Sequence, residues 1–302
     1  MLERERADHR FGSLLRWVAN HRPDPLVVLC ADAPADAAGT GTTVLRLTGC
    51  LADVPAHRLV DLALADGGTV LAAQDACPVR AALPHVEPLT ALTDGRVAVR
   101  TESPDPGQPA VVLEEAQPPV GRRFLVRRPS EPAVIEHPAE ADDQARLVAS
   151  LRALGVRGGA TDTADAPGVA LNVTGCIACG ICVRACPHDA LTLTHAAGMS
   201  TLAQRPERCH AEGACASACP EHAIRLGDHH SWATALSAEP LTLTRLHTRA
   251  CVRCGTAITL DRPDGLCATC AQRRSEPFGW DVPEGVRDRL PEHVRRRLEE
   301  RS

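Results

Sequence analysis

Hydrophobic and polar positions in the first hundred residues indicate helices that alternate with short buried strands. Apolar side chains between residues 11 and 18 recur at the spacing of one helical face, and those at 55–65 do so again. Three apolar runs, at 26–29, 44–47 and 69–73, have the length of buried strands. Strands separated by helix-sized spans favour a small parallel sheet with helices on its faces, which is an α/β domain.

Prolines interrupt this pattern between residues 101 and 138, where eight of them occur. A helix or a central strand does not tolerate that density, because each proline removes a backbone N–H donor. The stretch is therefore expected to be a linker or an extended wrapping segment. Helical spacing returns over 139–154, and Gly155 is suited to end that helix.

Two similar cysteine runs occur further along the chain. The first contains Cys176, Cys179, Cys182, Cys186 and Pro187, and the second contains Cys209, Cys215, Cys219 and Pro220. Each member of the second run lies 33 residues after its counterpart in the first, and the counterpart of Cys179 is Glu212. Thiolates are soft ligands that suit iron–sulfur clusters, and two-residue gaps let one loop present three sulfurs to one cluster. The repeat therefore predicts two cluster sites, of which the second lacks one cysteine.

The repeat extends beyond the cysteines, because residues 186–193 match residues 219–226. In each half, the start of a short helix and then a strand follow the fourth cysteine, and candidate partner strands lie near 169–173 and 200–204. The pattern predicts two pseudo-symmetric halves, each too small to fold alone. On these motifs, residues 169–226 resemble a bacterial-type two-cluster ferredoxin domain.

The resemblance implies which cysteines share a cluster. In two-cluster ferredoxins the fourth cysteine of a run, followed by Pro, ligates the other cluster. On that pattern, cluster I would be a [4Fe–4S] cluster held by Cys176, Cys179, Cys182 and Cys219. Cluster II would be held by Cys186, Cys209 and Cys215.

Glu212 leaves three outcomes open for cluster II. The cluster can be [3Fe–4S], with the fourth iron absent, as is often the case in related ferredoxins with a non-cysteine residue here. It can be [4Fe–4S], with Glu212, a hydroxide or the nearby His210 on the unique iron. It can also be lost, with Glu212 merely solvated. A carboxylate is a harder ligand than a thiolate, so we expect a labile fourth iron even where the position is filled.

A third group of cysteines forms two pairs, Cys251 with Cys254 and Cys267 with Cys270, separated by 12 residues. This spacing predicts a tetrahedral site with four cysteine ligands. The region resembles a zinc ribbon more than a rubredoxin, since residues 240–272 contain no Phe, Trp or Tyr. Four thiolates would close the coordination shell of Zn²⁺, which implies a structural or docking role.

Cys30, Cys50 and Cys77 each follow a predicted strand of the α/β domain. The carboxyl ends of parallel strands meet at one edge of a sheet, where ligands bind, so these three thiols are expected to face one pocket. With Thr48-Gly49-Cys50 and the helix after it, the region is similar to the small iron–sulfur (delta) subunit of some hydrogenases and heterodisulfide reductases. Two interpretations stay open: three buried structural thiols, or a metal, cluster or redox-thiol site.

Composition indicates the cellular compartment and the classes of partner that are expected for these sites. Fourteen cysteines are many for a chain whose N-terminus lacks the apolar core of a secretory signal. A soluble protein in the reducing cytoplasm is expected, where clustered cysteines are metal ligands more often than disulfides. No run approaches the roughly 18 apolar residues that span a bilayer. The net charge of −5 provides no overall basic field for nucleic acid or an anionic membrane.

The expected fold class is multidomain α/β plus α+β. Its parts are an α/β domain at 1–100, a Pro-rich linker or wrapping segment at 101–138, a helix and loop at 139–164, a dicluster ferredoxin domain at 165–230, a zinc ribbon at 240–272 and a charged helical tail at 273–302.

The expected function is single-electron transfer between the clusters and a partner oxidoreductase, such as a hydrogenase or a formate dehydrogenase. The sequence contains no recognisable nucleophile–base arrangement, Gly-rich dinucleotide loop or P-loop. The chain is therefore expected to be an electron-transfer subunit more than a complete enzyme. The alternative is a redox- or iron-responsive regulatory or assembly protein, in which the clusters and the zinc are structural or sensory.

Overall fold

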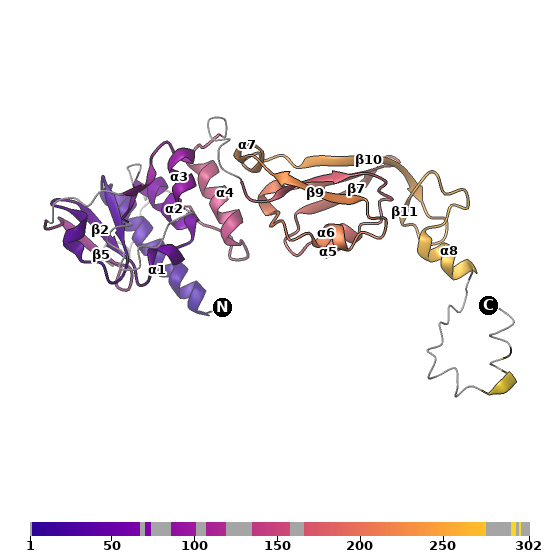
Figure 1. The fold of residues 1–302 in the computed structure, drawn as a ribbon, viewed down its shortest axis with the longest axis horizontal. Coiled ribbons are helices and arrows are strands. Elements are labelled where there is room, and N and C mark those ends of the chain that lie inside the picture. Colours follow the sequence, from indigo (N-terminus) through magenta and orange to yellow (C-terminus); the bar gives the residue numbers. More distant parts are fainter. Residues whose placement is uncertain are drawn as a thin grey trace.

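The structure, a computed structural model, describes residues 2–66, 70–73, 86–100, 107–118, 135–157, 166–275, 291–293 and 296. Its described parts follow one another along a long axis (Figure 1). An N-terminal α/β domain comes first, a middle domain carries the two cysteine runs, and the four-cysteine site lies beyond it. The two cysteine runs and the four-cysteine site therefore occupy separate parts of the molecule.

The N-terminal domain contains the expected parallel sheet, with five strands in the order β4-β3-β1-β2-β5. The strands are β1 (Leu26–Leu29), β2 (Thr43–Arg46), β3 (Val70–Ala73), β4 (Val97–Arg100) and β5 (Val111–Glu114). Every neighbouring pair is parallel. All residues of β1 are buried, because this central strand has partners on both sides and packing on both faces.

Helices cover this sheet and share its core. They are α1 (Leu2–His21), α2 (Ala56–Asp66), α3 (Glu87–Leu92) and α4 (Asp143–Ala153), with the 3₁₀ turns η1 (Ala35–Ala38) and η2 (Leu51–Asp53) in the connections. α2 packs against both α1 and α4 (Figure 1). Leu14, Leu59 and Leu151, one from each of these helices, are fully buried in the same hydrophobic core.

Part of the expected linker or wrapping segment packs with the α/β domain. Residues 111–114, inside the expected linker or wrapping segment, form β5 and pair with β2 at the edge of the sheet. An edge strand has one unpaired side, which makes it compatible with nearby prolines. α4 adds Val148 and Leu151 to the core of the first domain, so this helix packs as part of the α/β domain. The expected tail at 273–302 falls almost entirely outside the described residues.

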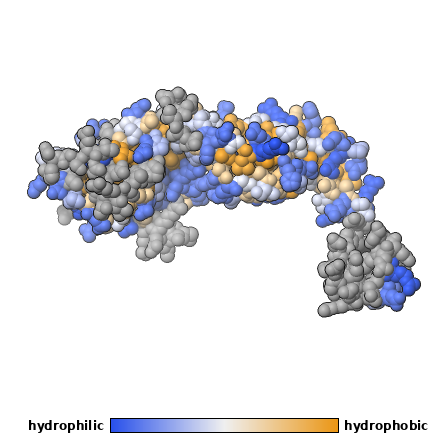
Figure 2. Space-filling view, in the orientation of Figure 1, coloured by the Kyte–Doolittle hydropathy of each residue, from blue (hydrophilic) through white to orange (hydrophobic). Residues whose placement is uncertain are grey.

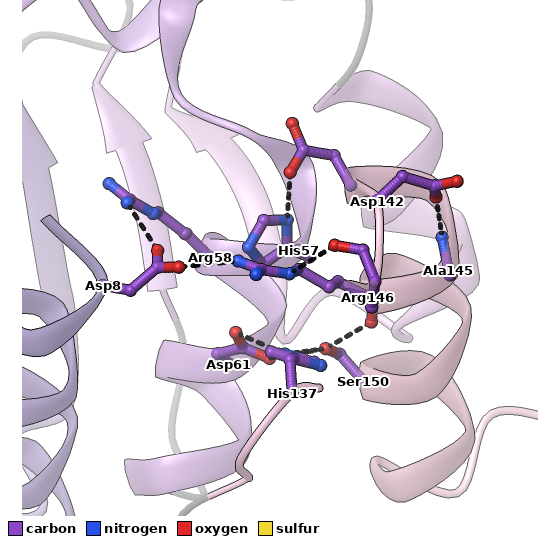
Figure 3. A network of polar contacts seen from close by, with 11 residues as sticks. Asp8, His57, Arg58, Asp61, His137, Asp142, Ala145, Arg146 and Ser150 are labelled. Atoms are coloured by element: carbon purple, nitrogen blue, oxygen red, sulfur yellow. Dashed lines mark hydrogen bonds and ion pairs between the residues drawn. The ribbon is translucent and has the colours of Figure 1, made fainter. Parts of the chain in front are cut away.

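A polar network fills the space between α1, α2 and α4 (Figure 3). The Asp8 carboxylate accepts hydrogen bonds from Arg58 at 3.3 Å and from Arg146 at 3.1 Å. Burial raises the pKa of Asp8, but the hydrogen bonds and charges of the two arginines outweigh that effect and lower it overall. One ionised carboxylate therefore ties α1 to both neighbouring helices.

A second buried carboxylate, Asp61, links α2 to α4 and to the segment before it. Ser150 donates to Asp61 at 2.5 Å, and the Nε2 atom of His137 lies 3.1 Å from the same carboxylate (Figure 3). The Ser150 hydroxyl donates to Asp61 and not to His137. The Nε2 atom of His137, which is the ring nitrogen nearest to that hydroxyl, is itself in contact with Asp61. This arrangement joins helices and does not have the order of a nucleophile, base and acid relay.

The middle domain and the four-cysteine site beyond it are built from antiparallel strands and short helices. The strands are β6 (Val169–Val173), β7 (Leu191–Ala196), β8 (Met199–Gln204), β9 (Ile224–His229), β10 (Leu241–Ala250) and β11 (Ala257–Thr259). The helices are α5 (Ile181–Ala185), α6 (Ala214–Ser217), α7 (Trp232–Ala235) and α8 (Ala268–Ser275), with the 3₁₀ turn η4 (Pro206–Arg208). β6 pairs with β9, so the first strand of one half of the repeat pairs with the last strand of the other.

β10 connects the middle domain to the four-cysteine site. Its first residues pair with β8, and its last residues pair with β11, giving the sheet order β11-β10-β8-β7. Cys251 follows directly on the last residue of this strand. The four-cysteine site is therefore attached through a continuous sheet, and Figure 1 shows β10 running along the top of the middle domain.

The N-terminal and middle domains make direct contact. Trp232 and Leu236, at and just after α7, are buried in the core of the first domain. Arg152 of α4 donates a hydrogen bond to the Leu236 carbonyl at 3.0 Å. Gln144, also from α4, donates to the carbonyls of Glu207 at 3.1 Å and Cys209 at 2.9 Å. α4 is thus packed against the loop that carries the second cysteine run.

Candidate iron–sulfur and metal centres

The four cysteines predicted for cluster I line one pocket. They are Cys176, Cys179 and Cys182 from the first run and Cys219 from the second. Leu193, Leu202 and Ile224 give this pocket apolar walls. The crossing of Cys219 to the first run follows from the fold, since the loop after α6 leads back to β9, the neighbour of β6. The structure thus gathers four thiols from two distant segments around one partly apolar space.

The backbone of the first run is shaped to turn N–H groups toward sulfur. Ala178 and Gly180 have positive φ angles of 56° and 68°, which curl the loop tightly around the pocket. The N–H of Ala178 points at the Cys176 sulfur, with nitrogen and sulfur 3.4 Å apart. The N–H of Ala223 points in the same way at Cys219, at 3.3 Å. Such donors stabilise thiolates that carry the charge of a cluster.

The second run repeats this backbone at the same offset, even around the missing cysteine. Ala211 and Gly213 have φ angles of 59° and 74°, close to those of their counterparts in the first run. Ala190 donates its N–H to the Cys186 sulfur at 3.4 Å, as Ala223 does to Cys219. The loop around Glu212 therefore keeps the form of a cluster-binding loop.

The three cysteines predicted for cluster II also come together. Cys215 interacts electrostatically with Cys209 and Cys186, so the three sulfurs lie in the same part of the domain. Burial raises the pKa of the Cys215 thiol, and the two neighbouring sulfurs raise it further, while the Ala216 N–H opposes them. Cys186 comes from the first run, so the crossing seen at the first pocket is repeated here.

The cysteine-lined pocket fits a group that supplies positive charge. Burial raises the pKa of Cys182 to about 11, and the sulfurs of Cys176 and Cys179 raise it as well. Several thiolates that line one pocket repel one another unless a cation lies among them. Bound iron meets this need, because a ligating thiol is deprotonated by its metal. Pocket shape, four sulfurs and inward N–H donors are together suited to a cubane cluster.

Glu212, at the position of the missing cysteine, contacts a neighbouring polar side chain. Its Oε1 atom lies 3.1 Å from Nε2 of His188, and its side chain is 53% exposed. His188 in turn stacks on His210, with the ring centroids 3.7 Å apart. His210 contacts the Asp142 carboxylate at 3.0 Å. The carboxylate is thus engaged in a polar cluster that contains two imidazoles and a second acid.

Sequence reasoning considered His210 as a ligand of cluster II but missed Asp142 and His188. A signal for the two histidines was present in the repeat, because their counterparts at the same offset are Ile177 and Glu221. His188 lies in the first half and His210 in the second, and neither counterpart position carries an imidazole. Asp142 could not be found in this way, because it caps α4 from the preceding position and reaches the site only through the domain contact.

The four-cysteine group predicted beyond the middle domain is assembled. The sulfurs of Cys251, Cys254, Cys267 and Cys270 all lie within 4.8 Å of one another. The N–H of Cys267 donates to the Cys251 sulfur at 3.3 Å and lowers the pKa of that thiol to about 6. Burial raises the pKa of Cys270 to about 12. A tetrahedral thiolate site needs this proximity, and the donor set suits Zn²⁺ or iron.

Two of the three N-terminal cysteines lie where the strand pattern placed them. Cys30 follows β1 and is 3% exposed, and its sulfur accepts the Leu51 N–H at 3.2 Å. Cys50 follows β2 and is half-buried. The N–H of Ala31 donates to the Gly49 carbonyl at 3.0 Å, so the two loops run side by side. Cys77 lies outside the described residues, and the expected three-thiol pocket stays a prediction.

Comparisons with known proteins bear on the middle domain. A search among curated proteins found no match to this chain. Among the helices of the described residues, none has the length and apolar character needed to cross a membrane. Residues 175–223 match the family described as the 4Fe–4S dicluster domain, a stretch that includes both cysteine runs. The middle domain is accordingly similar to a ferredoxin-like domain that binds 4Fe–4S clusters.

Proposed function

We propose that this chain is an iron–sulfur electron-transfer protein, or a subunit of a redox complex, that relays single electrons to a partner oxidoreductase. The observation that carries the proposal is the sorting of seven cysteines into a group of four and a group of three, each containing one cysteine from the other run. The family match over residues 175–223 supports the same chemistry.

Cys176, Cys179, Cys182 and Cys219 are the proposed ligands of a [4Fe–4S] cluster. A bound cluster supplies one-electron redox chemistry, with a potential set by its ligands, hydrogen bonds and exposure. The protein contributes apolar walls and inward N–H donors, such as that of Ala178, which favour the more negative, reduced state. On the face drawn in Figure 2, hydrophobic residues reach the surface over the middle of the molecule, which suits a surface for a redox partner.

Cys186, Cys209 and Cys215 are the proposed ligands of a second cluster of the [3Fe–4S] type. Support comes from the fourth position, where the Glu212 carboxylate is engaged by His188 at 3.1 Å. A hard carboxylate with such a partner competes poorly with thiolates for iron in a sulfur cage. A [4Fe–4S] form with a labile iron on Glu212 is the nearest alternative, and it predicts a different iron count.

The four-cysteine site is proposed to hold Zn²⁺ in a ribbon-like module with a structural or docking role. Support comes from the closed set of four thiols and from β10, which ties the site to the middle domain. Four protein ligands leave no open position for a substrate. Replacing Cys254 by Ser should remove about one zinc per chain and leave the cluster iron unchanged, as measured by elemental analysis.

The proposed partner is an oxidoreductase such as a hydrogenase or a formate dehydrogenase, in the reducing cytoplasm, without nucleic acid and without a membrane span. Catalysis would reside in that partner. The grouping of eleven cysteines into three candidate metal sites supports a reducing setting, because clustered cysteines there are metal ligands more often than disulfides.

An anaerobic redox titration of the full chain tests this function. We expect two reversible one-electron steps, together with rapid electron exchange with a hydrogenase or a flavoprotein. The variant Cys179→Ser should lose the step of cluster I, whereas Cys50→Ser, outside both groups, should keep both steps. A regulatory or assembly role would instead give tight binding to nucleic acid or to an apo-enzyme without electron exchange, and that result would refute the carrier proposal.

A further inference from the structure

We propose that Asp142, His188 and His210 form a binding site for a divalent transition-metal ion, separate from the clusters and from the four-cysteine site. One ligand atom from each of the three residues lies within 4.8 Å of those of the other two. Glu212 adds a second carboxylate, 3.1 Å from His188. Two imidazoles and a carboxylate are a donor set that suits Fe²⁺, Zn²⁺ and related ions.

Three separate segments bring these donors together. Asp142 is the residue that precedes α4, His188 follows the first cysteine run, and His210 follows Cys209. The Asp142 Oδ2 atom lies 3.0 Å from His210 Nε2 and 3.7 Å from His188 Nδ1. One carboxylate oxygen therefore lies near a nitrogen of each ring, so the three donor atoms of the proposed site are already neighbours.

The carboxylate is held in place by its other oxygen. Asp142 Oδ1 accepts the N–H of Ala145 at 2.8 Å and caps the first turn of α4. Gln144 fixes the opposite side of the site by donating to the Cys209 carbonyl at 2.9 Å, next to His210. Such supporting contacts orient metal ligands before the ion arrives. The site is thus braced by the contact between the two domains.

The side chains lie at an accessible depth. His188 and His210 are each 25% exposed and Asp142 is 39% exposed, so an ion can enter from solvent. The carboxylates of Asp142 and Glu212 bring two negative charges to the site, and the neutral form of each imidazole does not offset them. A divalent cation would balance this pair of negative charges at close range. The rings are stacked at an interplanar angle of 13°, and binding requires them to tilt so that both nitrogens face the ion.

Neither histidine of this site has an imidazole at its counterpart position in the repeat. The positions that correspond to His188 and His210 are Glu221 and Ile177, and the position that corresponds to Glu212 is Cys179. One thiolate is thus replaced, and two imidazoles are added, in the same neighbourhood. The proposal does not depend on electron transfer, because a metal can occupy this site whatever the clusters do.

Equilibrium dialysis of the full, cluster-containing chain against Zn²⁺ tests the site, with zinc, iron and sulfide counted per chain. The four-cysteine site is filled first, so that only additional zinc is scored. We expect the wild-type chain to take up about one more zinc than His188→Ala or His210→Ala. The exposed histidine variant His229→Ala is the matched control and should behave as wild type.

The variant Asp142→Asn keeps the test decisive if a histidine variant loses its fold. Asparagine caps a helix as well as aspartate does, so α4 should remain intact while the ligand charge is lost. We expect zinc affinity at this site to fall at least about tenfold, with cluster iron unchanged. Equal zinc uptake by the wild-type chain and all three variants would overturn the proposal, and would leave the four residues as an ion-pair network between domains.

Discussion

Glu212 occupies a loop whose backbone is that of a cysteine-bearing loop. The flanking residues Ala211 and Gly213 keep the positive φ angles of their counterparts Ala178 and Gly180. The loop with a carboxylate thus has the same backbone form as the loop with a thiol, and the two differ in the ligand that they offer. The carboxylate instead contacts His188, so the asymmetry of the two sites resides in side chains.

Single cysteine variants test the crossing of ligands between the runs. Cys219 belongs to the second run by sequence, yet it lines the pocket of the first. We expect Cys219→Ser to abolish the cluster I signal while the signal of cluster II persists. Cys186→Ser should have the opposite effect, because Cys186 lies with Cys215. Anaerobic EPR of both variants distinguishes this pattern from uncrossed ligation, in which each variant would damage the cluster of its own run.

Gly168 offers a test of packing around the second site. An added Cβ would lie 2.9 Å from Cβ of Cys209, and the φ angle of +84° costs a side chain roughly 1–2 kcal/mol. We expect Gly168→Ala to displace the Cys209 loop and to lower the occupancy of cluster II selectively. Gly95→Ala is the matched control, since Gly95 has a similar φ angle of +78° and open space around it. Full occupancy of both clusters in Gly168→Ala would contradict this account.

At the scale of elements, α4 and β10 determine how the sites are joined. α4 packs on α2, contributes Asp142 to the polar cluster and donates through Gln144 to the second cysteine run. β10 pairs with β8 at one end and with β11 at the other, which places the four-cysteine site at the end of a sheet. Both elements lie outside the repeat, yet they contact the domain that contains the two cysteine runs.

The contact between α2 and α4 should depend on pH through His57. This side chain is 3% exposed, and burial lowers its pKa from 6.5 to about 4. Between these two pKa values the unfolded chain binds more protons than the folded one, so stability falls as pH falls from 6.5 to about 4. The loss from this residue is at most on the order of 3 kcal/mol.

Urea unfolding at several pH values measures this dependence. Trp17 and Trp232 both pack against the core of the first domain, so tryptophan fluorescence follows its unfolding. We expect the urea midpoint of the wild-type chain to drop as pH falls through this range. His57→Gln cannot take up the proton and should show a flatter profile. Identical profiles for the two proteins would show that His57 does not carry the effect.

At the scale of the molecule, the sequence predicts local elements and ligand groups better than it predicts boundaries. The strands at 26–29, 44–47 and 69–73 are found at β1, β2 and β3, because short apolar runs have few other ways to be buried. Cysteines within one run lie close together because their spacing is a local property of a loop, whereas the exchange of Cys186 and Cys219 between the runs is implied only by the resemblance to two-cluster ferredoxins.

Long-range contacts account for what the sequence could not predict. Strand β5 was hidden in a proline-rich stretch, because its partner β2 lies more than 60 residues earlier. The sequence pattern predicts α4 as an isolated helix, and only its packing shows that it belongs to the first domain. Asp142 joins His188 and His210 through that packing, so no local motif could place it there. Tertiary contacts of this kind leave no periodic signal in a single sequence.

The most direct test of the whole account is an iron and sulfide count, with EPR, on the anaerobic oxidised chain beside its Glu212→Cys variant. A four-thiolate and a three-thiolate cluster predict about seven irons per wild-type chain and a three-iron EPR signal. The variant should hold about eight irons and lose that signal, because its loop backbone already suits a cysteine. About eight irons without a three-iron signal in the wild-type chain would contradict the account.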